Sequence, residues 1–181
     1  MATIIGEMEL KTIIQNNEII QNGDVKCAEG LKYDFRLGKK FLKAGSSSPK
    51  TYEELCACDK DCIEPGEVVF VLSEERLNVP KDVFIQLHTK RKLSHDGINL
   101  FGGTSVDPGY SGYLIFGMYN VAGTKYPLRP GRKLIGATFY RLSKNEIVNE
   151  PSRIPEPLED FPDNLIDLID RYKPVNPIAI N

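Results

Sequence analysis

The sequence predicts one mainly β domain of the sandwich, barrel or jelly-roll type, with a short N-terminal helix and a Pro-rich C-terminal tail. The 181 residues are enough for one domain with a substantial core and too few for two. Short apolar runs separated by Pro and Gly turns follow one another from residue 67 to residue 142, as in many-stranded folds. Beyond residue 149 prolines interrupt the chain and acidic residues outnumber basic ones. We therefore expect a β domain at residues 1–149 and a tail at 150–181.

The first third of the chain predicts a helix, two strands and a surface excursion. Residues 7–15 carry apolar side chains among charged ones, which is typical of a short amphipathic helix. Two strands are expected at residues 33–37 and 41–43, joined by a turn at 38–40. Residues 44–66 begin rich in Ser, Gly and Pro, so we expect them to leave the sheet.

The remainder predicts strand after strand, followed by one helix. Further strands are expected at residues 67–72, 83–89, 113–120, 126–128 and 133–142. In the tail, Leu165, Leu168 and Ile169 fall on one helical face of residues 164–172. We expect this helix to pack on the domain or on a neighbouring subunit.

Charge and hydropathy restrict the partners and the location. A net charge of -2 argues against a general nucleic-acid binder, although a pocket for a small anion needs only a few local cations. No apolar run approaches the roughly 20 residues that span a bilayer. Residues 1–20 lack the basic and apolar regions of a secretory signal. We expect a cytoplasmic protein with neither nucleic acid nor membrane as a partner.

The cysteines favour free thiols over a metal site. Cys27 stands alone, whereas Cys56, Cys58 and Cys62 share one loop. In a reducing cytosol these are expected to be free. The alternative is structural zinc, but C-x-C-x3-C lacks the paired C-x-x-C spacing of common zinc sites. We therefore predict no metal ligands in the chain itself.

Three short segments carry a family resemblance. They read Y-D-F-R-L-G at residues 33–38, E-R-L-N-V-P-K-D at 75–82 and V-D-P-G-Y-S-G at 106–112. Their order, behind an N-terminal helix, resembles that of dCTP deaminases and archaeal-type dUTPases. The resemblance covers roughly residues 7–142. It implies a dUTPase-like distorted β-barrel or jelly roll that assembles as a homotrimer with pockets at subunit interfaces.

The third segment is expected to carry the chemistry. Pro108 and Gly109 favour a tight turn whose backbone N–H and C=O groups can read the edge of a pyrimidine. In the family, the residue matching Asp107 orients or deprotonates the water that attacks the triphosphate, a role that suits a carboxylate. The residue matching Tyr110 lies against the deoxyribose. Taken alone, a capping Asp and a core Tyr would account for the same pattern. The nucleotide-binding residues that the resemblance implies here are Pro108, Gly109, Tyr110, Gly112 and Asn120.

A basic run stands where the family has its phosphate-binding motif, R-S-S-L-A-R. Arg91 and Lys92 replace the two serines, so positive charge is kept while the geometry differs. Alone, such a run is typical of a solvated turn. The phosphate-binding residues predicted by the resemblance are Lys90, Arg91, Lys92 and His95. Mg²⁺ is expected to arrive with the phosphates of a pyrimidine deoxynucleoside triphosphate.

Single residues decide which reaction is expected. The signature of zinc deaminases is absent, since His95 does not begin H-x-E. Metal-free dCTP deaminases use a glutamate ten residues beyond the aspartate that matches Asp107, and this chain has Gly117 there. We therefore predict a dUTPase-like hydrolysis of dUTP to dUMP and pyrophosphate. Gly136, where dUTPases have Gln, and the lack of a Gly-rich closing segment depart from that pattern.

Two alternatives stay open. One is an inactive nucleotide-binding or regulatory trimer built on the same fold. The other is a dCTP deaminase that uses a non-standard acid–base residue in place of the missing glutamate.

Overall fold

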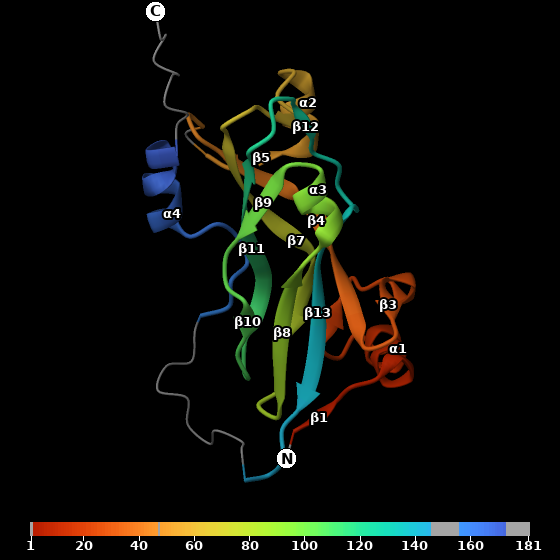
Figure 1. Cartoon of the computed structure of the whole chain (residues 1–181). Helices are drawn as coiled ribbons and strands as arrows, with labels where there is room; N and C mark the ends of the chain where they lie inside the picture. Colours follow the sequence, from red (N-terminus) through yellow and green to blue (C-terminus); the bar gives the residue numbers. More distant parts are fainter. Residues whose placement is uncertain (1, 47, 146–155, 173–181) are drawn as a thin grey trace, which may run out of the picture.

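A single curled sheet dominates the computed structural model, which describes residues 2–46, 48–145 and 156–172 (Figure 1). The path across the sheet is β10 (Ser105–Val106), β8 (Val83–Thr89), β13 (Lys133–Arg141), β4 (Lys32–Lys43), β7 (Val68–Asn78), β11 (Ser111–Asn120) and β9 (Ile98–Phe101). The two end strands, β10 and β9, are consecutive in the chain, and the sheet curls into an open half-barrel. This confirms the predicted β-rich class.

Short strands complete the β structure. Four of them pair with the main sheet: β1 (Thr3–Ile4), β2 (Ile20–Gln21), β3 (Ala28–Glu29) and β5 (Lys50–Thr51). A separate antiparallel ribbon consists of β6 (Cys62–Ile63) and β12 (Tyr126–Pro127).

Alternate side chains of β4 and β13 fill the inside of the half-barrel. On β4, Tyr33 and Phe35 are completely buried. Their rings pack edge to face with 5.1 Å between the ring centroids. Asp34, between them, points to the outer face. The same period of two places Ile135, Ala137 and Phe139 of β13 inside. Gly136, between the first two of these, therefore belongs to the outer face.

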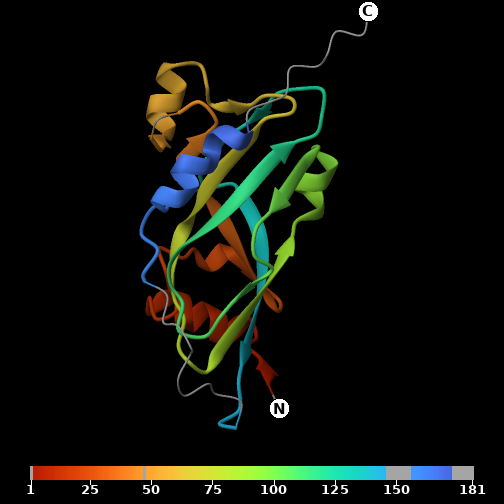
Figure 2. The same ribbon diagram turned by 90° about the vertical axis from the view of Figure 1, so that its left-hand side faces the viewer.

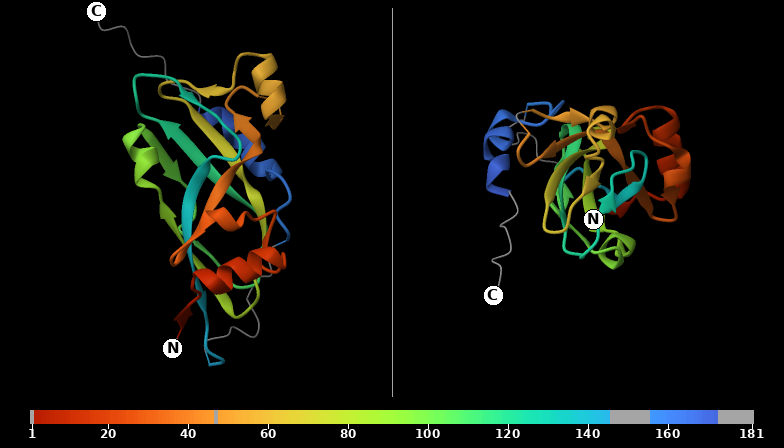
Figure 3. Two further views of the ribbon diagram at one scale, coloured as in Figure 1. Left: turned by 90° about the vertical axis from the view of Figure 1, so that its right-hand side faces the viewer. Right: turned by 90° about the horizontal axis from the view of Figure 1, so that it is seen from above.

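Helices lie at the periphery of the sheet. The predicted N-terminal helix is α1 (Glu7–Gln15), which buries Leu10, Ile13 and Ile14. The predicted tail helix is α4 (Asp163–Leu168), continued by the 3-10 turn η2 (Ile169–Tyr172). Seen from above, α1 and α4 lie on opposite sides of the molecule (Figure 3). Within the described ranges, no helix is both long and apolar enough to cross a membrane.

Three short helical segments were not predicted. The 3-10 turn η1 (Val25–Cys27) precedes β3. Helix α2 (Tyr52–Ala57) begins at a capping box, in which Thr51 and Glu54 exchange side-chain and backbone hydrogen bonds. Helix α3 (Arg91–His95) follows β8 and contains most of the basic run. That run is therefore a helix and not the open turn that its composition favours.

The predicted turn at residues 38–40 is wrong. β4 is one continuous strand that pairs first with β13 and then with β7, and its register shifts between Leu37 and Phe41. A Cβ on Gly38 would lie 2.8 Å from the carbonyl oxygens of Leu72 and Ser73. Gly38 thus permits a close approach of two backbones within a strand, which is the other common use of glycine in sheets.

The tail forms a second layer outside the sheet. Phe161 and Ile169 are buried against Leu42, Phe70 and other apolar residues on the outer face of the sheet. Figure 2 shows α4 lying across this face, next to β7 and β11. Residues 150–155 and 173–181 of the predicted tail lie outside the described residues.

Candidate functional site

The V-D-P-G-Y-S-G segment forms a tight turn that is fixed to the end of β7. Gly109 adopts a φ of +85°, which glycine tolerates without strain. Its N–H donates to the carbonyl of Val79 (3.0 Å), and the Val79 N–H donates to the carbonyl of Tyr110 (2.8 Å). Two of the recognised segments therefore hold each other in place. The turn presents Asp107 as an exposed carboxylate and leaves Pro108 half-buried.

Tyr110 is held firmly beside this carboxylate. Its ring is half-buried against the core, and its hydroxyl donates to the carbonyl of Tyr113. Burial raises the pKa of Tyr110 to about 12, partly countered by Arg76. The hydroxyl therefore stays protonated well above physiological pH and keeps its hydrogen bond to the Tyr113 carbonyl, which orients the ring.

The edge of β11 opposite β7 is shared between β9 and the tail. β9 pairs with β11 only from Gly117 to Asn120. Nearer the turn, Leu158 donates its N–H to the carbonyl of Ser111 (3.0 Å) and accepts from the N–H of Tyr113 (2.7 Å). The tail thus forms hydrogen bonds with one backbone donor (Tyr113 N–H) and one backbone acceptor (Ser111 C=O) at the start of β11, next to the turn, here called the hairpin edge.

Gly112 has a structural reason to be glycine. Its φ is +128°, and a Cβ there would lie 2.4 Å from the carbonyl oxygen of Leu158. The predicted nucleotide-binding glycine therefore contacts the backbone of the tail in this structure.

Gly117, at the position of the deaminase glutamate, lies beneath an aromatic ring. A Cβ at this position would be 2.1 Å from Cζ of Phe101. Phe101 contacts the rings of Phe70 and Tyr172, with centroid distances of 5.6 and 6.3 Å. Any side chain at position 117 would have to displace Phe101, so this place holds no acid–base group and no room for one.

A second candidate region is a cleft of about 700 Å³ on the outer face of the sheet, next to α3. Four lysine and arginine side chains and both histidines of the chain line it, against one carboxylate. Its lining residues are Lys32, Asp34, His88, Thr89, Lys90, Arg91, Lys92, His95 and Gly136. The structure therefore brings all four predicted phosphate-binding residues together in one positively charged cleft.

The floor of the cleft is a row of three residues on neighbouring strands. Gly136 pairs in register with Asp34 on one side and with His88 on the other. Asp34 is held by Lys90 (2.7 Å) and Lys133 (3.2 Å). Because Gly136 has no side chain, the floor between the carboxylate and the imidazole is open. The side chains of Arg91 and Lys92 are exposed at the rim, where the Lys92 ammonium lies 3.5 Å from the carboxylate of Asp96.

A buried charge network explains two of the recognised segments. Glu75 is completely buried and accepts hydrogen bonds from the Tyr33 hydroxyl (2.9 Å) and from Nε of Arg36 (2.6 Å). Burial raises the pKa of Glu75, and its bonds with Arg36 and Tyr33 offset part of that effect. These motif residues tie β4 to β7, and none of the three is among the residues that line the cleft.

The side-chain amide of Asn120 forms hydrogen bonds within the protein itself. Its amide donates to the carbonyls of Ile63 (2.9 Å) and Thr124 (2.8 Å), and its oxygen accepts from the N–H of Ala122 (3.0 Å). A direct contact with a nucleotide would require these bonds to break. Asn120 instead anchors the turn after β11 to the β6–β12 ribbon.

The cysteines do not converge. Cys27 is buried, Cys56 and Cys58 are exposed, and burial raises the pKa of the Cys27 and Cys62 thiols. Among the residues that the structure describes, no group of three or more His, Cys, Asp or Glu side chains is placed to hold a metal ion.

The turn and the cleft lie at different places on β8. Val106 pairs with Ile85, whereas the cleft begins at His88 and extends past Lys90. Lys90, directly after the end of β8, lies five residue steps beyond Ile85, or roughly 16 Å at about 3.3 Å per residue. Within one chain, Asp107 and the basic helix are therefore apart.

Known proteins resemble this chain in sequence and in fold. No family model matches it. A dCTP deaminase of Pyrococcus horikoshii is 30% identical over 110 residues, which cover 61% of this chain and 67% of the relative. A "dCTP deaminase, dUMP-forming" of Nanoarchaeum equitans is 23% identical over 171 residues, 79% of this chain and 86% of the relative.

Among solved structures, the 2'-deoxycytidine 5'-triphosphate deaminase of Agrobacterium tumefaciens superimposes with a TM-score of 0.62 at 17% identity. The match covers 77% of this chain and 49% of that one, so this chain spans about half the length of that deaminase. The fold and the sequence relatives agree with the three collinear segments. The chain therefore belongs to the dCTP deaminase and dUTPase superfamily.

Proposed function

We propose that the protein is a dUTPase-type pyrophosphatase that converts dUTP and water to dUMP and pyrophosphate. The observation that carries the proposal is the hairpin turn, which presents exposed Asp107 beside the fixed ring of Tyr110. Asp107 takes a proton from water as the water oxygen bonds to the α-phosphorus, and the bond to the bridging oxygen breaks. Gly117 beneath Phe101 favours hydrolysis over deamination, because deamination needs a proton shuttle at that place.

The positively charged cleft of one copy would hold the triphosphate of a nucleotide that binds at the turn of a neighbouring copy. On one chain, Lys90 lies roughly 16 Å along β8 from Ile85, the residue that pairs with Val106 at the start of the turn, and a triphosphate is shorter than that stretch. A homotrimer would place the turn of one copy next to the cleft of another. Mg²⁺ would come with the phosphates, and positioning and charge neutralisation would supply most of the catalysis.

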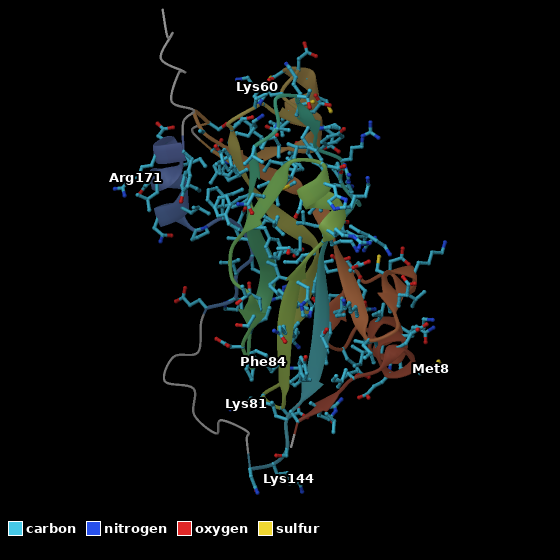
Figure 4. The ribbon with its side chains drawn as sticks, viewed as in Figure 1. Met8, Lys60, Lys81, Phe84, Lys144 and Arg171 are labelled. Carbon is cyan, nitrogen blue, oxygen red and sulfur yellow. The ribbon has the colours of Figure 1, made fainter. Side chains whose placement is uncertain are left out.

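Replacement of the aspartate tests the chemistry. Asp107→Asn should lower dUTP turnover at least about 100-fold while leaving nucleotide affinity and oligomer size unchanged, because it removes only the proton acceptor. Products from a panel of deoxy- and ribonucleoside triphosphates with Mg²⁺ are resolved by chromatography. Asp59→Asn is the matched control, since Asp59 is exposed and adjoins Lys60 at the opposite end of the molecule from Lys81 and the turn (Figure 4).

Other products would select another function. Full turnover by Asp107→Asn would refute the assignment of this residue. Conversion of dCTP to dUTP would establish a deaminase with a non-standard acid–base residue. Nucleotide binding without turnover would establish the regulatory alternative, which the altered phosphate motif and the tail on the hairpin edge favour.

A second replacement tests the cleft. Lys92→Ala should weaken binding of a triphosphate about fivefold and leave monophosphate binding unchanged, since an exposed cation contributes only to the outer phosphates. Titration calorimetry with both nucleotides measures this difference. Lys144→Ala is the control, because Lys144 lies at the far end of the molecule from α3 (Figure 4). Equal losses for both nucleotides would remove α3 from the phosphate site.

A further inference from the structure

The tail segment at residues 158–172, here called the strap, occupies the hairpin edge in cis. Leu158 forms a parallel bridge with Gly112 and satisfies the Ser111 carbonyl and the Tyr113 N–H. One peptide residue thus supplies a donor next to an acceptor. The edge of a pyrimidine offers the same kind of pair, so both ligands suit the same backbone groups.

Exposed ion pairs hold the beginning of the strap. Glu159 accepts hydrogen bonds from Nε of Arg76 (2.9 Å), and the same guanidinium donates to the Ser111 hydroxyl (3.0 Å). Asp160 pairs with Lys40. Because the Glu159 and Asp160 side chains are about half exposed, these pairs are screened by solvent and can be broken.

Aromatic contacts hold its end. Tyr172 packs edge-on to Phe70 (5.2 Å) and lies nearly parallel to Phe101, with 26° between the ring planes. Phe101 is the ring that covers Gly117. The side chain of Arg171, near the end of the strap, points away from the sheet (Figure 4). The strap therefore spans from the turn to the place of the missing glutamate.

We propose that the strap is an intramolecular competitor, latched by Glu159 and Asp160, which a pyrimidine deoxynucleotide must displace from Ser111 and Tyr113. The inference rests on the proposed nucleotide binding at the hairpin. It adds that the chain carries its own occupant of that edge. Apparent nucleotide affinity is then lowered by the fraction of molecules in which the strap is closed.

The test uses the full chain with two pairs of charge reversals. Glu159→Lys with Asp160→Lys turns both latch contacts into repulsions at exposed positions, so the core is not disturbed. Glu156→Lys with Asp167→Lys changes the charge equally at other exposed positions of the tail and is the control. The probe is a dUTP analogue with an imido group between the α- and β-phosphorus atoms. Calorimetry gives its affinity, and NMR gives the exchange of the Leu158 and Tyr113 amides.

Opening the latch should speed exchange of the Tyr113 amide and tighten analogue binding about tenfold, while the control behaves as the native chain. In the native chain, analogue binding should expose the Leu158 amide to exchange and keep that of Tyr113 protected. Unchanged Tyr113 exchange after charge reversal would refute the latch. Analogue bound with Leu158 still protected would refute the competition and leave the proposed function standing. No binding by the opened variant would refute both.

Discussion

At the scale of single residues, the ion pair between Arg36 and the buried Glu75 is expected to contribute strongly to stability. Arg36→Met would leave the carboxylate of Glu75 buried without its cation, at a cost of about 3–5 kcal/mol in the free energy of unfolding. Urea unfolding measures this loss. Adding Glu75→Gln should restore part of the stability, since a neutral amide needs no cation. A double variant as unstable as the single one would contradict the charge-based explanation.

Some of the site residues could be predicted from the sequence, and their neighbours in space could not. The V-D-P-G-Y-S-G turn and the basic run were identified from their letters, and the structure gives each a surface position. The neighbour of Gly112 was not predictable, because Leu158 is distant in sequence and no local pattern marks it. Phe101 was missed for a similar reason: an apolar residue in a strand gives no sign of which glycine it covers.

At the scale of elements, the long strands and the two amphipathic helices were predicted because periodicity is a local property, whereas the short strands β9 and β10 at the two ends of the sheet and the second half of β7 were missed. The 38–40 turn failed because a glycine within a strand and a glycine in a turn look alike in sequence. Helix α2 had a readable signal in the T-x-x-E pattern of its capping box. Helix α3 is only five residues long and follows a strand directly, so its composition suggested a turn.

The strap should loosen in acid. The hydrogen bond from Arg76 holds the pKa of Glu159 below its ordinary value, so the contact is present at neutral pH and is lost as pH falls through the lowered pKa. The NMR shift of the Tyr113 amide, followed downward from pH 7, should report this transition below the ordinary glutamate value of about 4.3. Glu159→Gln should abolish it. A transition at or above the ordinary value would show that the ion pair does not hold the strap.

At the scale of the whole molecule, the class of fold followed from the number and spacing of the strands. The curl of the sheet did not, because β9 and β10 lie at its opposite edges although they are neighbours in the chain. The separation of the turn from the cleft was equally hidden. It follows from the register of β10 on β8, which no motif encodes.

β4 has a consequence for how the molecule folds. Its first part belongs to the ladder with β13 and its second part to the ladder with β7, and no loop interrupts it. Loss of either ladder would disorder β4, and the other ladder depends on the same strand. We therefore expect the sheet to unfold as one cooperative unit in a single all-or-none step, as small single domains commonly do.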